Sequence, residues 1–313
     1  MTRAFVFPGQ GSQAVGMGRE LAEAFPAARQ VFEEVDEALK QSLSRLMFEG
    51  PEAELTLTEN AQPALMAVSM AVVRVLEAEG GLDLSKAARF VAGHSLGEYS
   101  ALAAASTFSL ADAARLLKTR GQAMQKAVPV GVGAMASLLG ADYEQAREIA
   151  AAAAEGEVCE AANDNAPGQV VVSGHKSAVE RAVAIAAGKG IKRAVMLPVS
   201  APFHCALMQP AADAMAEALA KVEMAIPAVP VVANVTARPV TDPAAIRDLL
   251  VAQVTGTVRW REGVLAMKEM GVATLVELGA GKVLSGLAKR IDKELAGTAV
   301  GTPADIDAFL KTL

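Results

Sequence analysis

The sequence predicts an α/β protein in which a small domain is inserted into a larger one. Near residue 95, a short apolar run, a glycine-flanked turn and a helix-like run follow one another, as where a buried strand leads into a helix. Residues 131–198 alternate short segments in the order βαββαβ, which is typical of a ferredoxin-like subdomain. We therefore expect a large domain over 1–128 and 198–313, and an insertion over 129–197.

Composition excludes several classes of protein. The 313 residues are 52% hydrophobic and 20% charged, which suits a soluble globular enzyme. Two cysteines, Cys159 and Cys205, argue against a disulfide framework and fit a reducing cytoplasm. The net charge of −6 disfavours general nucleic-acid binding. Residues 1–13 do not resemble a signal peptide, and prolines interrupt the longest uncharged stretch, 194–212, so we expect no membrane span.

The large domain is expected to begin with a strand over residues 3–7 and a glycine turn that does not have the spacing of a dinucleotide-binding loop. The hydrophobic period and the capping residues then predict one helix that begins at about residue 18 and further helices that we place at 25–48, 58–79 and 110–127. After the insertion we expect strands at 230–235 and 274–277, and helices at 209–222, 242–254, 261–270, 283–295 and 304–310.

The insertion is expected to contain four strands and two helices. The strands are predicted at 133–139, 158–162, 169–174 and 192–197, with a turn over 163–168, and the helices at 142–154 and 176–187. A cleft between two such domains is a favoured place for a ligand.

The segment Gly93-His94-Ser95-Leu96-Gly97 fits the G-x-S-x-G pattern of a nucleophile elbow. A sharp turn there would raise the serine oxygen above the end of the sheet, and the Leu96 N–H would open the next helix and stabilise an oxyanion. The loop after the first strand offers the Gln10 main-chain N–H as a second donor. The alternative is a tight turn in which Ser95 only caps a helix.

A serine nucleophile needs a base, and the chain has three histidines. His94 adjoins Ser95 and should project away from it, and His175 is expected in a surface turn. By elimination, His204 is the expected base, with a structural histidine as the alternative. Cys205 is interpreted as a packing residue. Because no carboxylate lies near His204 in the sequence, a carbonyl is expected to orient its ring.

Several motifs stand in an order that resembles one family. They are Phe7-Pro8-Gly9-Gln10-Gly11-Ser12-Gln13, Gly93-His94-Ser95-Leu96-Gly97-Glu98, Arg120 with Met124-Gln125, the segment 163–169, Pro202-Phe203-His204, Gln253 and Glu277-Leu278-Gly279. Together they resemble the malonyl-CoA:acyl-carrier-protein transacylases of bacterial fatty-acid synthesis over essentially the whole chain. One departure is Gly256-Thr257, where the family commonly has proline.

The resemblance implies an α/β-hydrolase-like large domain with a ferredoxin-like insertion, and a ping-pong transfer of the malonyl group through an acyl-serine. Ser95 would attack the thioester, and His204 would take its proton. The main-chain N–H groups of Gln10 and Leu96 would hold the oxyanion, and Arg120 would bind the free malonyl carboxylate, for which a planar guanidinium is well suited.

Further residues receive roles from the same resemblance. Gln253 would orient His204 through a carbonyl, and Gln62 and Asn165 would line the cleft. Phe203 would crowd an α-methyl group and so favour malonyl, although excluding one methyl is worth only about 1–3 kcal/mol.

The resemblance also implies the partners. Malonyl-CoA is the substrate, the acceptor is the phosphopantetheine thiol of acyl carrier protein, and no cofactor or metal is expected to be bound. We expect a cytoplasmic monomer that binds neither nucleic acid nor membrane. Because the carrier is acidic, a basic docking patch is expected, with Lys126, Lys189, Lys192 and Arg193 as candidates.

Two rival functions remain open from the sequence. An esterase or thioesterase of the α/β-hydrolase type would need an acid, and Asp112, Asp142 and Asp164 lie between the serine and His204. A catalytically silent docking subunit is the second rival, although the retained serine, histidine and arginine argue against it.

Overall fold

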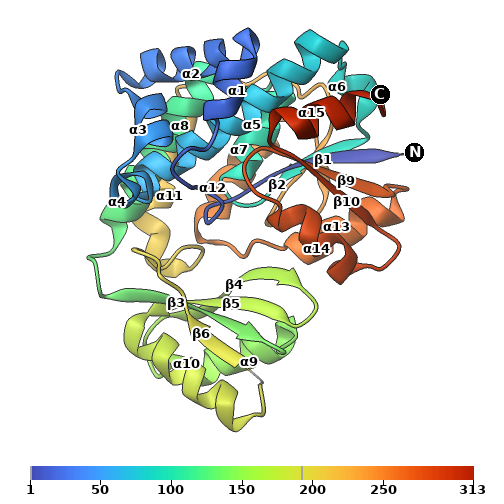
Figure 1. The fold of residues 1–313 in the computed structure, drawn as a ribbon. Helices are drawn as coiled ribbons and strands as arrows, with labels where there is room; N and C mark the ends of the chain where they lie inside the picture. The colour runs from blue at the N-terminus through green and yellow to red at the C-terminus, as the bar shows by residue number, and fades with distance from the viewer. Residues whose placement is uncertain (1, 192) are drawn as a thin grey trace.

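Two separate β-sheets organise the chain in the computed structural model, which describes residues 2–191 and 193–313 (Figure 1). A six-stranded sheet has the order β10-β9-β1-β2-β7-β8, and a four-stranded sheet has the order β4-β5-β3-β6. Each sheet lies in its own lobe, and the chain passes from the large lobe to the small one after helix α8 and returns after β6 (Figure 1). The prediction of a mixed α/β protein with a separate smaller sheet is confirmed.

The large sheet is parallel from β10 to β7, and only β8 runs antiparallel to its neighbour. Its strands are β1 Arg3–Phe7, β2 Phe90–Gly93, β7 Val231–Val232, β8 Pro239–Val240, β9 Thr274–Leu278 and β10 Ala296–Val300. Alternate residues of β1 enter two hydrophobic cores, because Phe5 and Phe7 belong to one cluster and Ala4 and Val6 to another. Helices therefore cover both faces of this sheet, as parallel sheets require.

The helices of the large lobe divide between these two faces. They are α1 Arg19–Ala24, α2 Pro26–Leu39, α3 Leu43–Glu49, α4 Glu52–Leu55, α5 Thr58–Gly80, α6 Leu84–Ala87, α7 Gly97–Ala104, α8 Leu110–Ala127, the 3-10 helix η1 Ala206–Met208, α11 Gln209–Leu219, α12 Pro243–Thr255, α13 Trp260–Glu269, α14 Val283–Ile291 and α15 Pro303–Leu310. Residues of α5, α7 and α8 share the core with Phe7, whereas residues of α13 and α14 fill the core on the other face.

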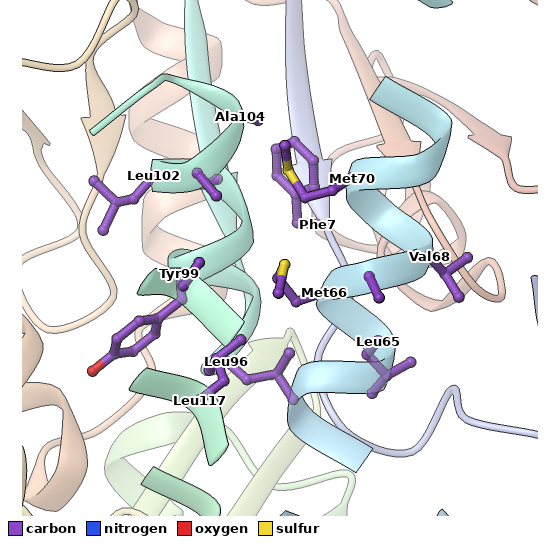
Figure 2. Packing of buried hydrophobic residues seen from close by; sticks show 14 of the residues in the cluster. Phe7, Leu65, Met66, Val68, Met70, Leu96, Tyr99, Leu102, Ala104 and Leu117 are labelled. Atoms are coloured by element: carbon purple, nitrogen blue, oxygen red, sulfur yellow. The ribbon is translucent and has the colours of Figure 1, made fainter. Parts of the chain in front are cut away.

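Helix α5 is the central helix of the larger core. It is long and apolar enough to cross a membrane by those two criteria alone, but 83% of the qualifying window is buried inside the protein. Figure 2 shows Met66 and Met70 of α5 turned toward Phe7 and α7. The apolar character of this helix is therefore accounted for by its burial between α2, α7, α8 and the sheet.

The small lobe has an antiparallel sheet that packs against two helices. Its elements are β3 Gly133–Leu139, α9 Tyr143–Ala154, β4 Cys159–Ala166, β5 Gln169–His175, α10 Lys176–Gly188 and β6 Arg193–Met196. Their shared core consists largely of alanine and valine, which brings both helices close to the sheet. The expected strand over 192–197 corresponds to β6, and its residue Lys192 lies outside the described residues.

Several predicted boundaries were wrong. The helix expected over 25–48 is divided, because Lys40 adopts a left-handed conformation (φ 53°) that ends α2. Strand β4 continues to Ala166, so residues 163–166 lie in a strand and not in the expected turn. The expected helix 283–295 ends at Ile291 and is followed by β10, an edge strand exposed along most of its length that lacks the apolar run of a buried strand.

The two glycines of the elbow are required by close backbone approach. A Cβ on Gly93 would lie 1.9 Å from the carbonyl carbon of Gly97, and a Cβ on Gly97 would lie 2.2 Å from the carbonyl oxygen of Phe7. Both neighbours are backbone atoms, so neither can rotate away. The turn at residue 95 therefore fits against β1 only without these side chains.

We expect Gly97→Ala to destabilise the protein by about 2 kcal/mol or more, because the sheet and α7 must separate to accept the methyl group. Gly286→Ala in α14 is the matched control, since no atom lies within 4 Å of its added Cβ. Chemical denaturation followed by circular dichroism measures both. Equal unfolding midpoints for the two variants would contradict the packing argument.

Candidate active site

The nucleophile elbow forms where β2 ends and α7 begins. Ser95 lies in the turn with φ 54°, a left-handed conformation that is unusual for a residue with a side chain. His94 N–H donates to the Phe7 carbonyl at 3.1 Å, which ties the turn to the neighbouring strand β1. Ser95 is therefore presented at the carboxyl edge of the parallel sheet, where open α/β sheets bind their ligands.

His204 lies directly against the serine. Its Nε2 is 2.7 Å from Ser95 Oγ, and its Nδ1 is 2.9 Å from the main-chain oxygen of Gln253. Because a carbonyl can only accept, Nδ1 must carry the proton, and Nε2 is left to accept the proton of Ser95. The ring is 3% exposed, on the loop before η1.

Burial lowers the pKa of His204 to about 3, and the nearby Arg120 charge acts in the same direction. The imidazole is therefore neutral at physiological pH, which is the form that can act as a base. Burial also lowers the pKa of His94. Its Nε2 is 2.8 Å from Oδ1 of Asn165, so this ring is hydrogen-bonded to a residue of the small lobe and not to Ser95.

Arg120 of α8 is 1% exposed and is hydrogen-bonded to several residues of the site. Its Nη1 donates to Gln62 Oε1 at 2.8 Å, and its Nη2 donates to Gln253 Oε1 at 2.9 Å and to Ser95 Oγ at 3.1 Å. The guanidinium lies over the Tyr99 ring, 5.7 Å from its centroid. Its Nε is buried and has no hydrogen-bond partner within the described part of the chain, so one donor is unsatisfied beside the nucleophile.

Two main-chain N–H groups near Ser95 are also unused. The N–H groups of Leu96 and Gln10 make no hydrogen bond within residues 2–191 and 193–313. Gln10 follows β1 and Ser95 follows β2, and Phe7 pairs with Gly93 at the ends of these strands, so both loops leave the same edge of the sheet. The side chain of Gln10 is held by Thr58, whose hydroxyl donates to Gln10 Oε1 at 2.6 Å.

The remaining predicted residues surround this group. Gln62 is buried on α5 and holds Arg120. Asn165, on β4, reaches the elbow from the small lobe through His94. Phe203 is half-buried and packs against hydrophobic clusters of both lobes. The structure therefore brings most of the predicted residues to one place.

Sequence reasoning missed two buried residues of the site. The side chain of Asn234, just after β7, accepts from Ser95 N–H and donates to the Gly93 carbonyl, both at 2.7 Å. Glu98 Oε2 accepts from the Gln253 side chain at 2.7 Å and from Asn234 N–H at 3.1 Å. Glu98 was part of the elbow motif, but nothing in the neighbouring sequence indicated that its side chain would bind Gln253 and Asn234. Asn234 follows a strand of only two residues, and nothing in the neighbouring sequence indicated its contact with Ser95.

The hydrolase alternative lacks its acid. Asp112 lies in the first turn of α8 and pairs with Arg115, Asp142 caps helix α9, and Asp164 forms an ion pair with Arg261 at 2.8 Å. In the described residues, His204 is hydrogen-bonded to Ser95 and Gln253 and to none of these carboxylates.

The two cysteines do not indicate thiol chemistry. Cys205 is buried as expected, and burial raises the pKa of its thiol to about 11. Burial likewise raises the pKa of the Cys159 thiol to about 11. The described ranges hold no group of three or more residues that could bind a metal ion.

The predicted docking patch stays a prediction. Lys126 and Arg193 are exposed, Lys189 lies 3.8 Å from Glu148, and Lys192 is not among the described residues. A cavity of about 850 Å³ lies between the small lobe and the segment around Thr257, and Ser95 is not among its lining residues. Four acidic residues accompany its three arginines, so its charge does not favour a phosphate group.

The stability of the protein should depend on pH through two groups of opposite effect. Below about pH 6.5 the unfolded chain protonates His204, whereas the folded protein does so only near pH 3, so His204 lowers stability as the pH falls through this range. Burial raises the pKa of Glu98 from 4.5 to about 7, so Glu98 lowers stability as the pH rises through that range.

Glu98→Gln removes the second contribution. We expect the Tm of the native protein relative to this variant to be higher at about pH 5 than at about pH 8. Glu23→Gln, at an exposed position of α1, is the control variant. A Tm difference for Glu98→Gln that does not change with pH would contradict the assignment.

Comparisons with known proteins agree on one family. The sequence profile of the acyl transferase domain matches residues 4–299. The malonyl CoA-acyl carrier protein transacylase of Salmonella typhimurium is 48% identical over 307 residues, 98% of each chain. The enzyme of the same name from Bacillus subtilis is 46% identical, covering 99% of this chain and 96% of the relative.

Solved structures give the same result. The acyl-carrier-protein-S-malonyltransferase from Bartonella henselae superimposes with a TM-score of 0.97 at 59% identity, covering 100% of this chain and 99% of that one. A malonyl-transacylase solved in complex with a type II PKS acyl-carrier protein gives a TM-score of 0.96 at 45% identity over 100% of both chains.

Proposed function

This chain belongs to the malonyl CoA-acyl carrier protein transacylase family of acyl transferases, and from this premise we propose that it transfers a malonyl group through Ser95. The donor is malonyl-CoA, and the acceptor is the phosphopantetheine thiol of acyl carrier protein. The observation that carries the assignment of residues is the contact of Ser95 Oγ with both His204 and Arg120. A base and a carboxylate-binding cation therefore meet at one hydroxyl.

In the first half-reaction, Ser95 Oγ attacks the thioester carbonyl carbon while its proton passes to His204 Nε2. The Gln253 carbonyl, held by Nδ1–H, stabilises the imidazolium that forms. The N–H groups of Leu96 and Gln10 bind the oxyanion of the tetrahedral intermediate. Cleavage of the carbon–sulfur bond releases coenzyme A, which takes the proton from His204 and leaves malonyl-Ser95.

The second half-reaction runs these steps in reverse with a different thiol. The phosphopantetheine thiol of the carrier gives its proton to His204 and attacks the ester carbonyl of malonyl-Ser95. Collapse of the intermediate returns the proton to Ser95 Oγ and leaves the malonyl group on the carrier as a thioester. One imidazole therefore serves as base and acid in each half.

Arg120 selects the acyl group. In the free protein its Nη2 rests on Ser95 Oγ, so a malonyl group attached to that oxygen brings its carboxylate within reach of the guanidinium. Gln62 and Gln253 hold the guanidinium from two sides. The buried cation then gains a charged partner, which an acetyl group cannot supply. Phe203 and Asn165 complete the cleft.

The proposal extends to the finer architecture. We propose that the large lobe, 1–128 and 198–313, is an α/β-hydrolase-like domain and that the small lobe, 129–197, is a ferredoxin-like subdomain; the elbow and the β4-β5-β3-β6 sheet support this. No resident cofactor is needed, since the carrier brings its own phosphopantetheine. A cytoplasmic enzyme that acts as a monomer is consistent with one complete site in one chain.

The test is intact-mass spectrometry of the protein after mixing with malonyl-CoA, followed by addition of carrier bearing phosphopantetheine. We expect a malonyl adduct that disappears as the carrier gains the same mass. Acetyl-CoA is the parallel sample and should give little adduct. Absence of an adduct, or release of free malonate faster than transfer, would overturn the proposal.

A further inference from the structure

The backbone around Ser95 is held by a residue from another part of the sheet. Asn234 Oδ1 accepts from Ser95 N–H and Asn234 Nδ2 donates to the Gly93 carbonyl, both at 2.7 Å. One side-chain amide therefore satisfies an acceptor and a donor that lie on either side of His94, at the end of β2 and within the turn. A buried turn would otherwise leave both groups unpaired, which is costly.

Asn234 is itself fixed within the protein core. It is 4% exposed and follows β7, the strand that pairs with β2. Its main-chain N–H donates to Glu98 Oε2 at 3.1 Å, and its main-chain oxygen accepts from Arg259 N–H at 3.0 Å. All four of its polar groups are thus used before any substrate arrives, and its side chain has little freedom to turn.

Glu98 extends the same network to the base and the cation. Its Oε2 accepts from Gln253 Nε2 at 2.7 Å, and Gln253 Nε2 also donates to the Ser95 carbonyl at 3.0 Å. Gln253 Oε1 then faces Arg120 and its main-chain oxygen faces His204. The buried Glu98 carboxyl therefore links Asn234, which bonds the backbone of the elbow, to Gln253. Gln253 in turn contacts Arg120 and His204.

The hydrogen bond from the Ser95 N–H to Asn234 also concerns the main-chain N–H groups that are available to an oxyanion. Asn234 accepts from the N–H of Ser95, and the next N–H along the turn, that of Leu96, has no partner among the described residues. The same bond opposes relaxation of Ser95 from its left-handed conformation to an ordinary one. Loss of the amide would let Oγ move relative to His204.

We propose that Asn234 is a positioning residue for acyl transfer, whose amide holds the backbone leading into Ser95, at the Gly93 carbonyl and the Ser95 N–H, so that Oγ stays against His204 and the Leu96 N–H stays free. The inference rests on the proposed role of Ser95 as the acylated residue. Asn234 does not touch the substrate and acts only through the turn.

The test is single-turnover acylation by malonyl-CoA, measured by rapid quench and intact mass. For Asn234→Ala we expect the rate constant at saturating malonyl-CoA to fall about 10- to 100-fold, since small misplacement of a reacting atom has effects of this size. The fraction of molecules that become acylated should stay close to that of the native protein, and the half-saturating concentration should change less than about threefold.

Asn60→Ala is the matched control. Asn60 is a buried asparagine whose amide bonds Gln41, Lys118 and the Glu54 carbonyl, away from the elbow. It should lose stability without losing acylation rate. A reduced acylated fraction with an unchanged rate constant in Asn234→Ala would mean a merely structural role and would overturn the proposal, as would a native rate.

Asn234→Asp provides a readout that folding alone does not move. A carboxylate can accept from Ser95 N–H but cannot donate to the Gly93 carbonyl, whereas a protonated carboxyl can do both. We expect its acylation rate, taken relative to the native protein, to rise as the pH falls. Other titratable or charged groups also lie near this position, namely Glu98, His204, Arg120 and Arg259. Their effect on the pH dependence is common to both proteins, so the ratio of the variant rate to the native rate removes it.

A ratio that does not change with pH would overturn the proposal for Asn234. Failure of the native protein to become acylated would instead overturn the proposed function together with this inference. The two failures are therefore distinguishable in one experiment.

Discussion

Ser95→Ala is expected to form no malonyl adduct and to malonylate the carrier at least about 10⁴-fold more slowly than the native protein. The reason is that the whole reaction passes through one covalent bond to Oγ. His204 and Arg120 both contact that oxygen, so removing it leaves a base and a cation with nothing to act on. Intact mass and a carrier-malonylation assay measure the two effects.

Ser100→Ala is the matched control for this variant. Ser100 lies on the same helix α7, is fully buried, and has a hydroxyl without a hydrogen-bond partner among the described residues. Removing it should leave both the adduct and the transfer rate unchanged. An adduct of full yield in Ser95→Ala would show that a different residue carries the acyl group.

The elbow could be predicted from the sequence because it is a local feature. Its glycines, serine and following helix lie within a few residues, and each is explained by the turn itself. His204 could be found by elimination, since only three histidines were available. Arg120 could not be derived from spacing, because a charged residue on a helix is usually solvated; only the resemblance indicated its role.

Asn234 and the role of Glu98 were beyond sequence reasoning for a physical reason. Asn234 is 139 residues from Ser95, and Gln253 is 155 residues from Glu98, so their contacts depend on strand order and not on spacing. Strand β10 was missed for a related reason. It is stabilised by pairing with β9, while its own side chains are mostly exposed.

Arg120→Ala should collapse the preference for malonyl over acetyl. We expect kcat/KM for malonyl-CoA to fall about 10²- to 10³-fold, because truncating one partner of a buried charge pair costs a few kcal/mol. Acylation by acetyl-CoA should not fall in parallel, since the buried guanidinium offers an uncharged methyl group no partner. The ratio of the two kcat/KM values is the measurement.

Two further variants separate charge from geometry. Arg120→Lys keeps the cation but loses the planar fork that Gln62 and Gln253 hold, so it should fall between the native protein and Arg120→Ala. Arg115→Ala, at an exposed site of α8 paired with Asp112, should leave the ratio unchanged. Retained malonyl preference in both Arg120 variants would place the carboxylate elsewhere. In that case the contact between Arg120 and Ser95 would serve only to position the nucleophile.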